Sequence, residues 1–428
     1  MGFHGYFMKI SVIGAGYVGC VTGICLAEIG HDVFLIDVDS GKLEALRAGK
    51  CPVFEPGLND LLAKNHRKIR TTPDISEAIQ ETELTLICVG TPQNRDGSID
   101  LRYVIHAAQS IGRVLRSKNN YHTIVVKSTV LPGTTVNVLL PVLESESGKR
   151  AHQDFGIASN PEFLKEGSAV EDFFHTDRII IGTQNQKTRI LLDELYKPLN
   201  APVFNTDIKT AEMIKYVSNA FLATKISFAN EIGNMCKAVG IDTEEVFKGV
   251  GMDTRINPHF FRSGIGFGGS CFPKDIHALI HFAELLGVDP KILKATIATN
   301  DSQPLKMITL LKKHRDIRGK KIGVLGLAFK PGTDDIRESR ALPIVQQLLK
   351  EGAEVLVYDP LAMPAFSAII PSIQYAFSAQ DVVDTGIVLI VTEWEEFEDL
   401  DYNGKLVIDG RRIRKAQQEA AIYEGLCW

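Results

Sequence analysis

The 428-residue chain is too long for one hydrophobic core, so its length predicts two or three domains. Its hydrophobic content of 45% and charged content of 23% are typical of a globular protein. The net charge of −5 argues against a protein that binds nucleic acid or membrane surfaces through its charge.

Other whole-chain features point to a cytoplasmic protein. No apolar run is long enough to span a bilayer, and residues 1–7 lack the charged and apolar regions of a signal peptide. The seven cysteines are scattered and are expected to be reduced thiols. Since they form no CxxC or clustered Cys/His spacing, we expect no metal site.

The first expected elements surround a glycine-rich turn. A buried strand at 8–13 leads into GAGYVG (14–19), a helical pattern covers 21–29, and a second strand at 31–36 ends at Asp37. This context predicts a dinucleotide-binding turn, because the glycines allow close backbone approach to a pyrophosphate at a helix N-terminus. A carboxylate at Asp37 would bind ribose hydroxyls and repel a 2′-phosphate, which favours NAD over NADP. A tight turn without a ligand is the less favoured alternative.

The alternation of strands and helices then continues. Further strands are expected at 84–89, 123–127 and 155–159. Because ligands bind beyond the carboxyl ends of parallel strands, Thr91, Thr129 and Glu162 are expected to line one cleft. If residues 160–167 are helical, Glu162 and Glu166 share a face and could position a water or substrate hydroxyls. A solvated pair of glutamates is the alternative.

A single long helix is expected over residues 207–239. Lys215 and Asn219 stand four residues apart and project on the same side, although a solvated helix face would explain them equally well. A helix of this length suits both a connector between two α/β halves and a dimer interface. A shorter helix is expected at 243–251, and residues 255–262 lead into the next segment.

Residues 264–275 carry the strongest sign of covalent chemistry. Four glycines precede Cys271 within seven residues, and Lys274 and Asp275 follow it. A cation beside a thiol favours the nucleophilic thiolate, so Cys271 is a candidate nucleophile. The alternative is a buried, inert cysteine in a flexible loop. Lys274 could lower the pKa of Cys271 or bond to nearby backbone, and the glycines would let the backbone approach a substrate.

The C-terminal part repeats the α/β pattern. Strands are expected at 321–326, 353–359, 387–391 and 406–409, and the first two resemble the strands at 9–14 and 31–37. The first turn of this part lacks the GxGxxG glycines, so a second dinucleotide is not expected. Lys330 and the pair Arg411-Arg412 lie beyond strand ends, where they could bind a phosphate or sugar, although surface arginine pairs are common.

These patterns predict an α/β protein with two doubly wound Rossmann-like domains joined by a long central helix. The expected domains are an NAD-binding domain (1–206), a central helical and dimerisation region with Cys271 (207–302), and a C-terminal Rossmann-like domain (303–428).

Taken together, the motifs resemble those of the UDP-glucose/GDP-mannose dehydrogenase family over nearly the whole chain from Met8. The motifs that carry the resemblance are GAGYVG (14–19), VGTP (89–92), KSTV (127–130), NPEFLKEG (160–167), Lys215 with Asn219, GFGGSCFPKD (266–275) and Phe329-Lys330. The resemblance implies that the C-terminal domain (303–428) is the nucleotide-sugar (UDP)-binding domain. Residues 1–7 have no counterpart in the family pattern.

The resemblance implies oxidation of a sugar C6 alcohol to a carboxylate with two NAD⁺ and no metal. Cys271 would capture the aldehyde as a thiohemiacetal, which a second hydride transfer converts to a thioester for hydrolysis. UDP-glucose is the expected substrate, and its product UDP-glucuronate would enter polysaccharide biosynthesis. GDP-mannose and UDP-N-acetylmannosamine are alternative substrates. Alternatives of other classes are a two-electron hydroxy-acid dehydrogenase and a non-catalytic NAD-binding sensor.

The resemblance also implies roles for individual residues. The implied catalytic residues are Cys271, Lys215, Asn219, Asp275, Glu162 and Thr129. Lys215 and Asn219 would stabilise oxyanions near C6, and Asp275 would hold a water with Lys215. Glu162 would take part in general-base or hydrolytic chemistry, and Thr129 would order the water network.

Ligand contacts are implied in the same way. The implied cofactor-binding residues are Gly14, Gly16, Tyr17, Val18, Gly19, Asp37, Lys42, Thr91, Thr129, Glu166, Lys274 and Arg337. The implied substrate-binding residues are Glu162, Phe163, Leu164, Lys215, Asn219, Arg255, Phe260, Gly268, Phe329, Lys330 and Arg412, with Arg411 as the alternative to Arg412. Arg255 would reach the site of a partner subunit in a homodimer. Arg337 would reach the cofactor from the C-terminal domain, which implies a site closed between two halves.

Overall fold

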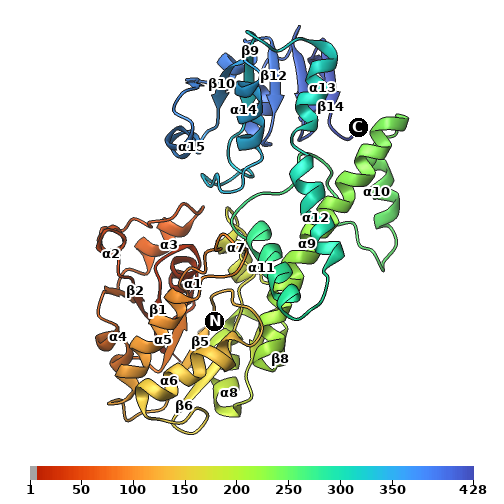
Figure 1. The fold of residues 1–428 in the computed structure, drawn as a ribbon. Coiled ribbons are helices and arrows are strands. Elements are labelled where there is room, and N and C mark those ends of the chain that lie inside the picture. The colour runs from red at the N-terminus through yellow and green to blue at the C-terminus, as the bar shows by residue number, and fades with distance from the viewer. Residues whose placement is uncertain (1–6) are drawn as a thin grey trace. The chain divides into compact units, whose positions relative to one another are not determined.

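The computed structural model describes residues 7–428, so six of the seven residues without a family counterpart lie outside the described part. The chain divides into two compact units between Ser218 and Asn219, within the helix α9 (Ile208–Val239). Figure 1 draws the first unit in red to yellow-green and the second in green to blue. Within residues 7–428, no helix combines the length and apolar character needed to cross a membrane.

The first unit is built on an eight-stranded sheet with the strand order β3-β2-β1-β4-β5-β6-β7-β8. Its strands are β1 (Lys9–Ile13), β2 (Asp32–Ile36), β3 (Ile69–Thr72), β4 (Leu84–Ile87), β5 (His122–Val126), β6 (Phe155–Ser159), β7 (Ile179–Gly182) and β8 (Val203–Thr206). Every neighbouring pair is parallel except β6 and β7, which pair antiparallel at Ser159 and Gly182. The strand order reverses at β1, between β2 and β4, and ligands bind at such points in doubly wound sheets.

Helices cover both faces of this sheet. They are α1 (Tyr17–Glu28), α2 (Ser40–Arg47), α3 (Leu58–Lys64), α4 (Ile75–Glu81), α5 (Arg102–Leu115), the π-helix η1 (Thr135–Leu139), α6 (Leu140–Ser147), α7 (Ala169–Phe174), α8 (Gln186–Tyr196) and the 3₁₀ helix η2 (Lys197–Leu199). Because side chains alternate along a strand, Val33 and Leu35 pack into one core, and Phe34 and Ile36 into the other. Beyond its first residue, Asp32, β2 is therefore apolar, as parallel strands covered on both faces are.

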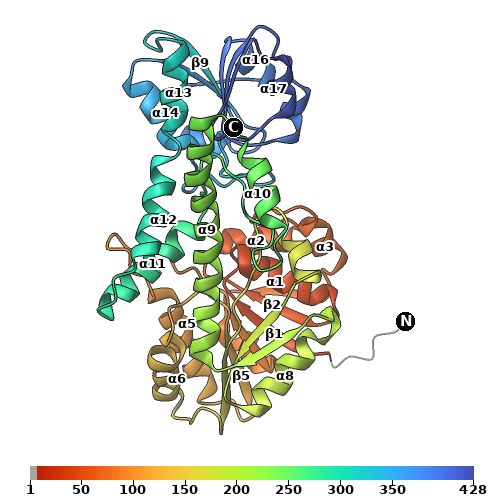
Figure 2. The ribbon, with the colours of Figure 1, turned by 90° about the vertical axis from the view of Figure 1, so that its right-hand side faces the viewer.

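The second unit begins with the C-terminal part of α9, which Figure 2 shows as one unbroken helix. The helices that follow are α10 (Thr243–Gly251), α11 (Phe272–Leu285), α12 (Lys291–Ser302), α13 (Lys306–His314), α14 (Ala341–Lys350), α15 (Met363–Ile369), α16 (Ala379–Val383), η3 (Glu395–Asp399) and α17 (Arg414–Glu419). The strands are β9 (Lys321–Leu325), β10 (Glu354–Tyr358), β11 (Gln374–Tyr375), β12 (Ile387–Ile390), β13 (Leu406–Asp409) and β14 (Ile422–Gly425).

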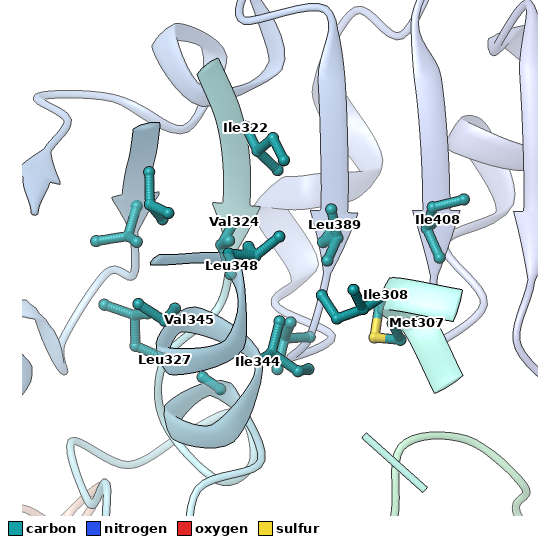
Figure 3. Packing of buried hydrophobic residues seen from close by; sticks show 14 of the residues in the cluster. Met307, Ile308, Ile322, Val324, Leu327, Ile344, Val345, Leu348, Leu389 and Ile408 are labelled. Carbon is teal, nitrogen blue, oxygen red and sulfur yellow. The ribbon is translucent and has the colours of Figure 1, made fainter. Parts of the chain in front are cut away.

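These six strands form an all-parallel sheet in the order β11-β10-β9-β12-β13-β14. Figure 3 shows one of its two cores, in which Val324, Leu389 and Ile408 of neighbouring strands face α13 and α14. The alternate strand residues Leu325 and Ile390 pack into the core on the opposite face. The predicted fold class, two doubly wound α/β domains and a long central helix, is confirmed.

The elements differ from the sequence-based expectation in two respects. Residues 160–165 form an irregular loop that ends in a turn at 166–167, so Glu162 and Glu166 do not share a helical face and that expectation is wrong. The sequence interpretation also missed β3, β7, β8, β11 and β14. These strands are short, and β8 lies exposed at the edge of its sheet, so its residues lack the apolar pattern of a buried strand.

Candidate active site

The glycine-rich turn between β1 and α1 has the geometry that a dinucleotide requires. Gly14 has a φ of 101°, which glycine adopts readily, and a Cβ on Gly19 would lie 1.7 Å from the Gly14 carbonyl oxygen. A Cβ on Gly16 would meet nothing within 4 Å, so the space beside it is open. Gly16 is also the N-cap of α1 and has no side-chain cap, so the first N–H groups of the helix are available to an anion. These residues therefore fit the pyrophosphate of NAD.

The carboxylate of Asp37 stands at the end of β2, beside this turn. Its Oδ2 accepts hydrogen bonds from the Ala15 N–H at 2.7 Å and from Lys42 Nζ at 3.3 Å. Its Oδ1 accepts from the Asp39 N–H at 2.9 Å. This position suits a contact with ribose hydroxyls. The Thr91 hydroxyl donates to the Thr129 carbonyl oxygen at 2.9 Å, and the cleft that these two residues and Glu162 are expected to line stays a prediction.

The second sheet also has an aspartate at the position that corresponds to Asp37, but its carboxylate has different hydrogen-bond partners. Asp359 is fully buried after β10, and its Oδ2 accepts from Leu327 N at 2.7 Å, Ala328 N at 3.0 Å and Trp394 Nε1 at 3.0 Å. Its Oδ1 accepts from two further backbone N–H groups of residues 361 and 362. The carboxylate therefore holds its own turn together instead of facing a ribose.

Glu162 and Lys215 form a buried ion pair in the first unit. Lys215 Nζ lies 3.0 Å from Glu162 Oε1, with side-chain exposures of 5% and 8%. Glu162 Oε2 accepts from the Leu164 N–H at 2.5 Å. Burial by itself raises the pKa of Glu162, but the charge and hydrogen bond of Lys215 outweigh it and lower the pKa overall. Glu162 is therefore an ionised counter-ion of Lys215, and its general-base role stays a prediction.

The irregular loop at 160–167 is fixed by side chains from several elements. The Asn160 amide oxygen accepts from Lys127 Nζ at 3.1 Å and from the Tyr196 hydroxyl, and its amide nitrogen donates to the Ile180 carbonyl oxygen. The Phe163 ring lies 4.0 Å from the Arg178 guanidinium and 5.4 Å from Lys215 Nζ. Leu164 and Glu166 are half-buried in the same loop. The loop therefore has a defined shape without regular secondary structure.

In the second unit, Cys271 is the N-cap of α11 and is exposed. The Ser270 hydroxyl lies 3.7 Å from Cys271 Sγ. The N-terminus of a helix favours negative charge, which suits a thiolate at this position. By contrast, Cys20, Cys25, Cys88 and Cys236 are buried. Because Cys271 is exposed, the alternative of a buried, inert cysteine at this position is wrong.

Asp275 lies one turn into α11 and is 1% exposed. Its Oδ1 accepts from Lys274 Nζ and its Oδ2 from Asn219 Nδ2, each at 2.6 Å. Lys274 therefore binds the carboxylate of the next residue, and its effect on the pKa of Cys271 stays a prediction. Asn219 is 6% exposed and has a buried partner, so the solvated-face alternative fails for this residue.

The glycines before Cys271 lie against other residues of the second unit, and their role toward a substrate stays a prediction. A Cβ on Gly268 would lie 2.3 Å from the Glu338 carbonyl oxygen, and one on Gly269 would lie 2.8 Å from the Phe329 ring. Gly266 has a φ of 95°, and Asn300 Oδ1 lies where a Cβ on Gly266 would be. This oxygen accepts a hydrogen bond from the Phe267 N–H at 2.7 Å. The loop is therefore rigidly held, and Phe329 is one of its supports.

The remaining predicted side chains have these surroundings. Arg255 is exposed and pairs with Asp253 at 2.6 Å, and Arg337 pairs with Asp335 at 2.7 Å. Lys330 Nζ lies 5.7 Å from the ring of the preceding residue, and Phe260 has a φ of 68°. Arg412 pairs with Asp242 at 2.7 Å and Glu244 at 3.2 Å, and stacks on Trp428 at 4.3 Å.

Arg411 points elsewhere than Arg412. Its Nε donates to the Val391 carbonyl oxygen at 2.7 Å, and its guanidinium reaches the Phe329 carbonyl oxygen at 3.5 Å. The structure thus places Arg411, and not Arg412, beside Phe329. No group of three or more potential metal ligands occurs among His, Cys, Asp and Glu of the described residues.

Several residues that shape the site were missed by sequence reasoning: Glu55, Lys127, Arg178, Tyr196, Asp242 and Asn300. Lys127 gave a signal, since a lysine at the end of a wholly buried strand requires a polar partner. The other five gave none, because their partners are remote in sequence.

Comparison with known proteins agrees with this arrangement. Three domains of the UDP-glucose/GDP-mannose dehydrogenase family match the chain: the NAD binding domain at 8–200, the central domain at 209–302 and the UDP binding domain at 323–416. A UDP-glucose 6-dehydrogenase of Haloferax volcanii is 46% identical, covering 98% of this chain and 100% of the relative. A GDP-mannose 6-dehydrogenase of Pseudomonas syringae pv. tomato is 41% identical, with the same coverage.

A solved structure, a UDP-glucose dehydrogenase of the archaeon Pyrobaculum islandicum, superimposes with a TM-score of 0.96 at 45% identity. The match covers 100% of this chain and 99% of that one. The identity, the coverage and the order of the three domains lead to one conclusion. The chain belongs to the UDP-glucose/GDP-mannose dehydrogenase family.

Proposed function

We propose that this protein oxidises C6 of UDP-glucose to the carboxylate and so produces UDP-glucuronate. The observation that carries the proposal is Cys271, exposed at the N-terminus of α11 one turn before the buried Asp275. A two-electron alcohol dehydrogenase needs no such thiol. A second oxidation at the same carbon does, because the aldehyde must first become tetrahedral before it can release a hydride.

The proposed reaction has four steps. Bound NAD⁺ supplies a hydride acceptor for each of the two oxidations. C6 loses a hydride while its hydroxyl loses a proton, which gives the aldehyde. The Cys271 thiolate adds to the aldehyde, and the thiohemiacetal then loses a second hydride and a proton to become a thioester. Water cleaves the C–S bond and restores the thiolate, so one alcohol, one water and two NAD⁺ yield one carboxylate, two NADH and three protons.

The remaining site residues support these steps in the proposal. Lys215 and Asn219 stand one turn apart on α9 and provide an ammonium and an amide for the oxyanions at C6. Asp275, balanced by Lys274 and Asn219, accepts a proton during addition and hydrolysis. Thr129 orders water, and the loop at 160–167 presents Phe163 and Leu164 to the sugar.

UDP-glucose is favoured over GDP-mannose as the substrate. Relatives named UDP-glucose 6-dehydrogenase reach 46% and 43% identity, whereas the GDP-mannose 6-dehydrogenase of Pseudomonas syringae pv. tomato reaches 41%. The C-terminal match is to a UDP binding domain. In the proposal, Lys330 and Arg412 (or Arg411) contact the nucleotide sugar in this domain, and Arg337 contacts the cofactor.

The yield of NADH per sugar tests this function. With limiting UDP-glucose, we expect about two NADH per sugar consumed, because both oxidations occur before release. UDP-galactose, GDP-mannose and UDP-N-acetylmannosamine, measured alongside, should show lower kcat/KM. A yield near one NADH per sugar would contradict the thioester route. A higher kcat/KM for another sugar would reassign the substrate. If none of the sugars yielded NADH, a non-catalytic NAD-binding protein would be favoured.

We propose the domain division 1–206, 207–302 and 303–428, which the three family domains at 8–200, 209–302 and 323–416 support. The two compact units divide within α9 instead, between Ser218 and Asn219. All seven cysteines are free, which supports a reducing, cytoplasmic location.

A homodimer through α9 completes the proposal. Exposed apolar side chains recur along one face of this helix at Val217, Phe221, Phe228, Met235 and Val239. Their spacing of four and seven residues is that of a helix that packs against another helix. A single chain leaves this stripe in water, and a second copy would cover it. Arg255, which is exposed, would then reach the partner's site.

Charged side chains introduced into this apolar stripe should prevent the two subunits from associating. We expect the double variant Phe221→Asp/Phe228→Asp to run as a monomer in light scattering and to lose activity, because two carboxylates cannot be buried unpaired. The matched control is Ile190→Asp on α8, an exposed apolar residue away from the stripe. An unchanged mass for the double variant would remove α9 from the interface.

A further inference from the structure

Glu55 is a buried carboxylate with no role in the proposed chemistry. It lies just before α3, is 5% exposed, and accepts hydrogen bonds at both oxygens. Its Oε2 accepts from the Tyr17 hydroxyl and from the Gly167 N–H at 2.7 Å. Its Oε1 accepts from the Ala169 N–H at 2.6 Å and, more weakly, from the Val170 N–H at 3.4 Å. Hydrogen bonds to an ionised acceptor are among the stronger ones in proteins.

The donors come from two parts of the site that are far apart in sequence. Tyr17 is the first residue of α1 and belongs to the glycine-rich fingerprint. Gly167 ends the loop that carries Glu162 and Glu166, and Ala169 begins α7. The Glu55–Gly167 bond spans 112 residues of sequence, and the Tyr17–Glu55 bond spans 38. One carboxylate thus bridges the cofactor turn and the loop at 160–167.

The bridge also supplies a cap that the local sequence lacks. Ser168, the N-cap of α7, makes no side-chain cap bond to this helix. Glu55 takes over the backbone N–H groups that a local cap would satisfy. At the other end, burial and the adjacent Glu55 raise the pKa of Tyr17, so the tyrosine keeps its proton and acts as the donor.

We propose that Glu55 is a positioning residue that holds the loop at 160–167 against the fingerprint helix, so that cofactor affinity depends on the loop. The proposal rests on the proposed function in assigning Glu162 and Glu166 to the site. A specific consequence of the proposal is that Tyr17 affects cofactor affinity through its hydrogen bond to Glu55. A residue that merely stabilised the fold would change stability without changing ligand affinity.

The test uses Glu55→Gln, Tyr17→Phe and the double variant in the full-length protein. Glutamine keeps the volume but presents one NH₂ group to groups that are themselves donors, so at least one side of the bridge is lost. We expect the Kd of NADH, measured by fluorescence titration, to rise about 10-fold in Glu55→Gln and several-fold in Tyr17→Phe. The double variant should bind no more weakly than Glu55→Gln.

The matched control is Glu144→Gln. Glu144 also accepts a backbone hydrogen bond, from Ala151 N at 2.9 Å, but lies on α6, which holds no site residue. We expect its NADH affinity and kcat/KM to stay at the wild-type values. In Glu55→Gln, kcat/KM for the sugar should fall about 10- to 100-fold.

Two results would overturn the proposal: an unchanged Kd of NADH in a folded Glu55→Gln, or additive losses in the double variant. If Glu55→Gln fails to fold, Tyr17→Phe alone tests the proposal, because this variant keeps the bonds from Glu55 to Gly167 and Ala169. An unchanged Kd of NADH in Tyr17→Phe would then overturn the proposal. The titration contains no sugar. If the wild type fails to oxidise UDP-glucose, the proposed function fails and the test of Glu55 still stands.

Discussion

Cys271→Ser is expected to lower the rate of carboxylate formation at least about 1,000-fold, because a serine hydroxyl is a far weaker nucleophile than a thiolate at neutral pH. The variant should still bind NADH and the nucleotide sugar, since Cys271 is exposed and supports no core. Rapid-quench analysis of products should show that the reaction stalls before the free acid appears.

A second cysteine provides the control for this experiment. Cys51 is half-buried, and burial raises its pKa to about 11, so it carries no thiolate at neutral pH. Cys51→Ser should form the acid at close to the wild-type rate. If Cys271→Ser did so as well, the nucleophile would have to be reassigned and the proposed covalent route abandoned.

Lys215→Met is expected to be the most damaging single change to stability and also to reduce activity. It keeps the volume of the side chain but leaves the Glu162 carboxylate buried without its cation. Breaking a buried pair in this way costs about 3–5 kcal/mol in the free energy of unfolding. Loss of an oxyanion donor should lower kcat about 100- to 1,000-fold. Urea unfolding and steady-state kinetics measure the two effects separately.

The double variant Lys215→Met/Glu162→Gln separates charge from shape. Because it removes both charges, it should recover much of the lost unfolding free energy without recovering activity. If the single variant were as stable as the wild type, the ion pair would contribute nothing and the assignment of Glu162 as a counter-ion would fail.

The pH dependence of stability follows from the same pair. The folded-state pKa of Glu162 is lowered, so its contribution to stability is present above the unfolded value of about 4.3 and is lost as the pH falls through the folded value. In Lys215→Met, burial becomes the main influence and is expected to raise that pKa, opposed by the Leu164 N–H and the charge of Lys127. The variant should then lose stability as the pH rises above about 4.3, the opposite slope to that of the pair.

Much of the fold could be predicted because its signals are local. The strand β1, the GAGYVG turn and Asp37 lie within a single βαβ unit, and close neighbours leave no room for a side chain at Gly14 or Gly19. The central helix, predicted at 207–239 and found at Ile208–Val239, is set by an uninterrupted run without proline. Edge strands such as β8 were not predicted, because exposure removes the alternation of apolar and polar residues that identifies a strand.

The site was less predictable than the fold. The sequence predicts that Lys274 acts on Cys271 or on nearby backbone, and the structure adds the carboxylate of Asp275 as its hydrogen-bond partner. The sequence predicts that the glycines at 264–269 allow close approach to a ligand, and the structure adds Asn300, Phe329 and Glu338 as the residues that lie where their side chains would be. Both additions depend on which groups the folded chain brings together, and the sequence does not show this.

The sequence by itself determined the doubly wound halves, the NAD fingerprint, and the i,i+4 placement of Lys215 and Asn219. All of these depend on residues within one or two turns of each other. Only the tertiary structure decided that Glu162 is the ionised partner of Lys215, 53 residues away, and that Glu55 joins Tyr17 to Gly167. Those pairs form because burial makes an unpaired charge or N–H group costly, and burial is a property of the folded chain.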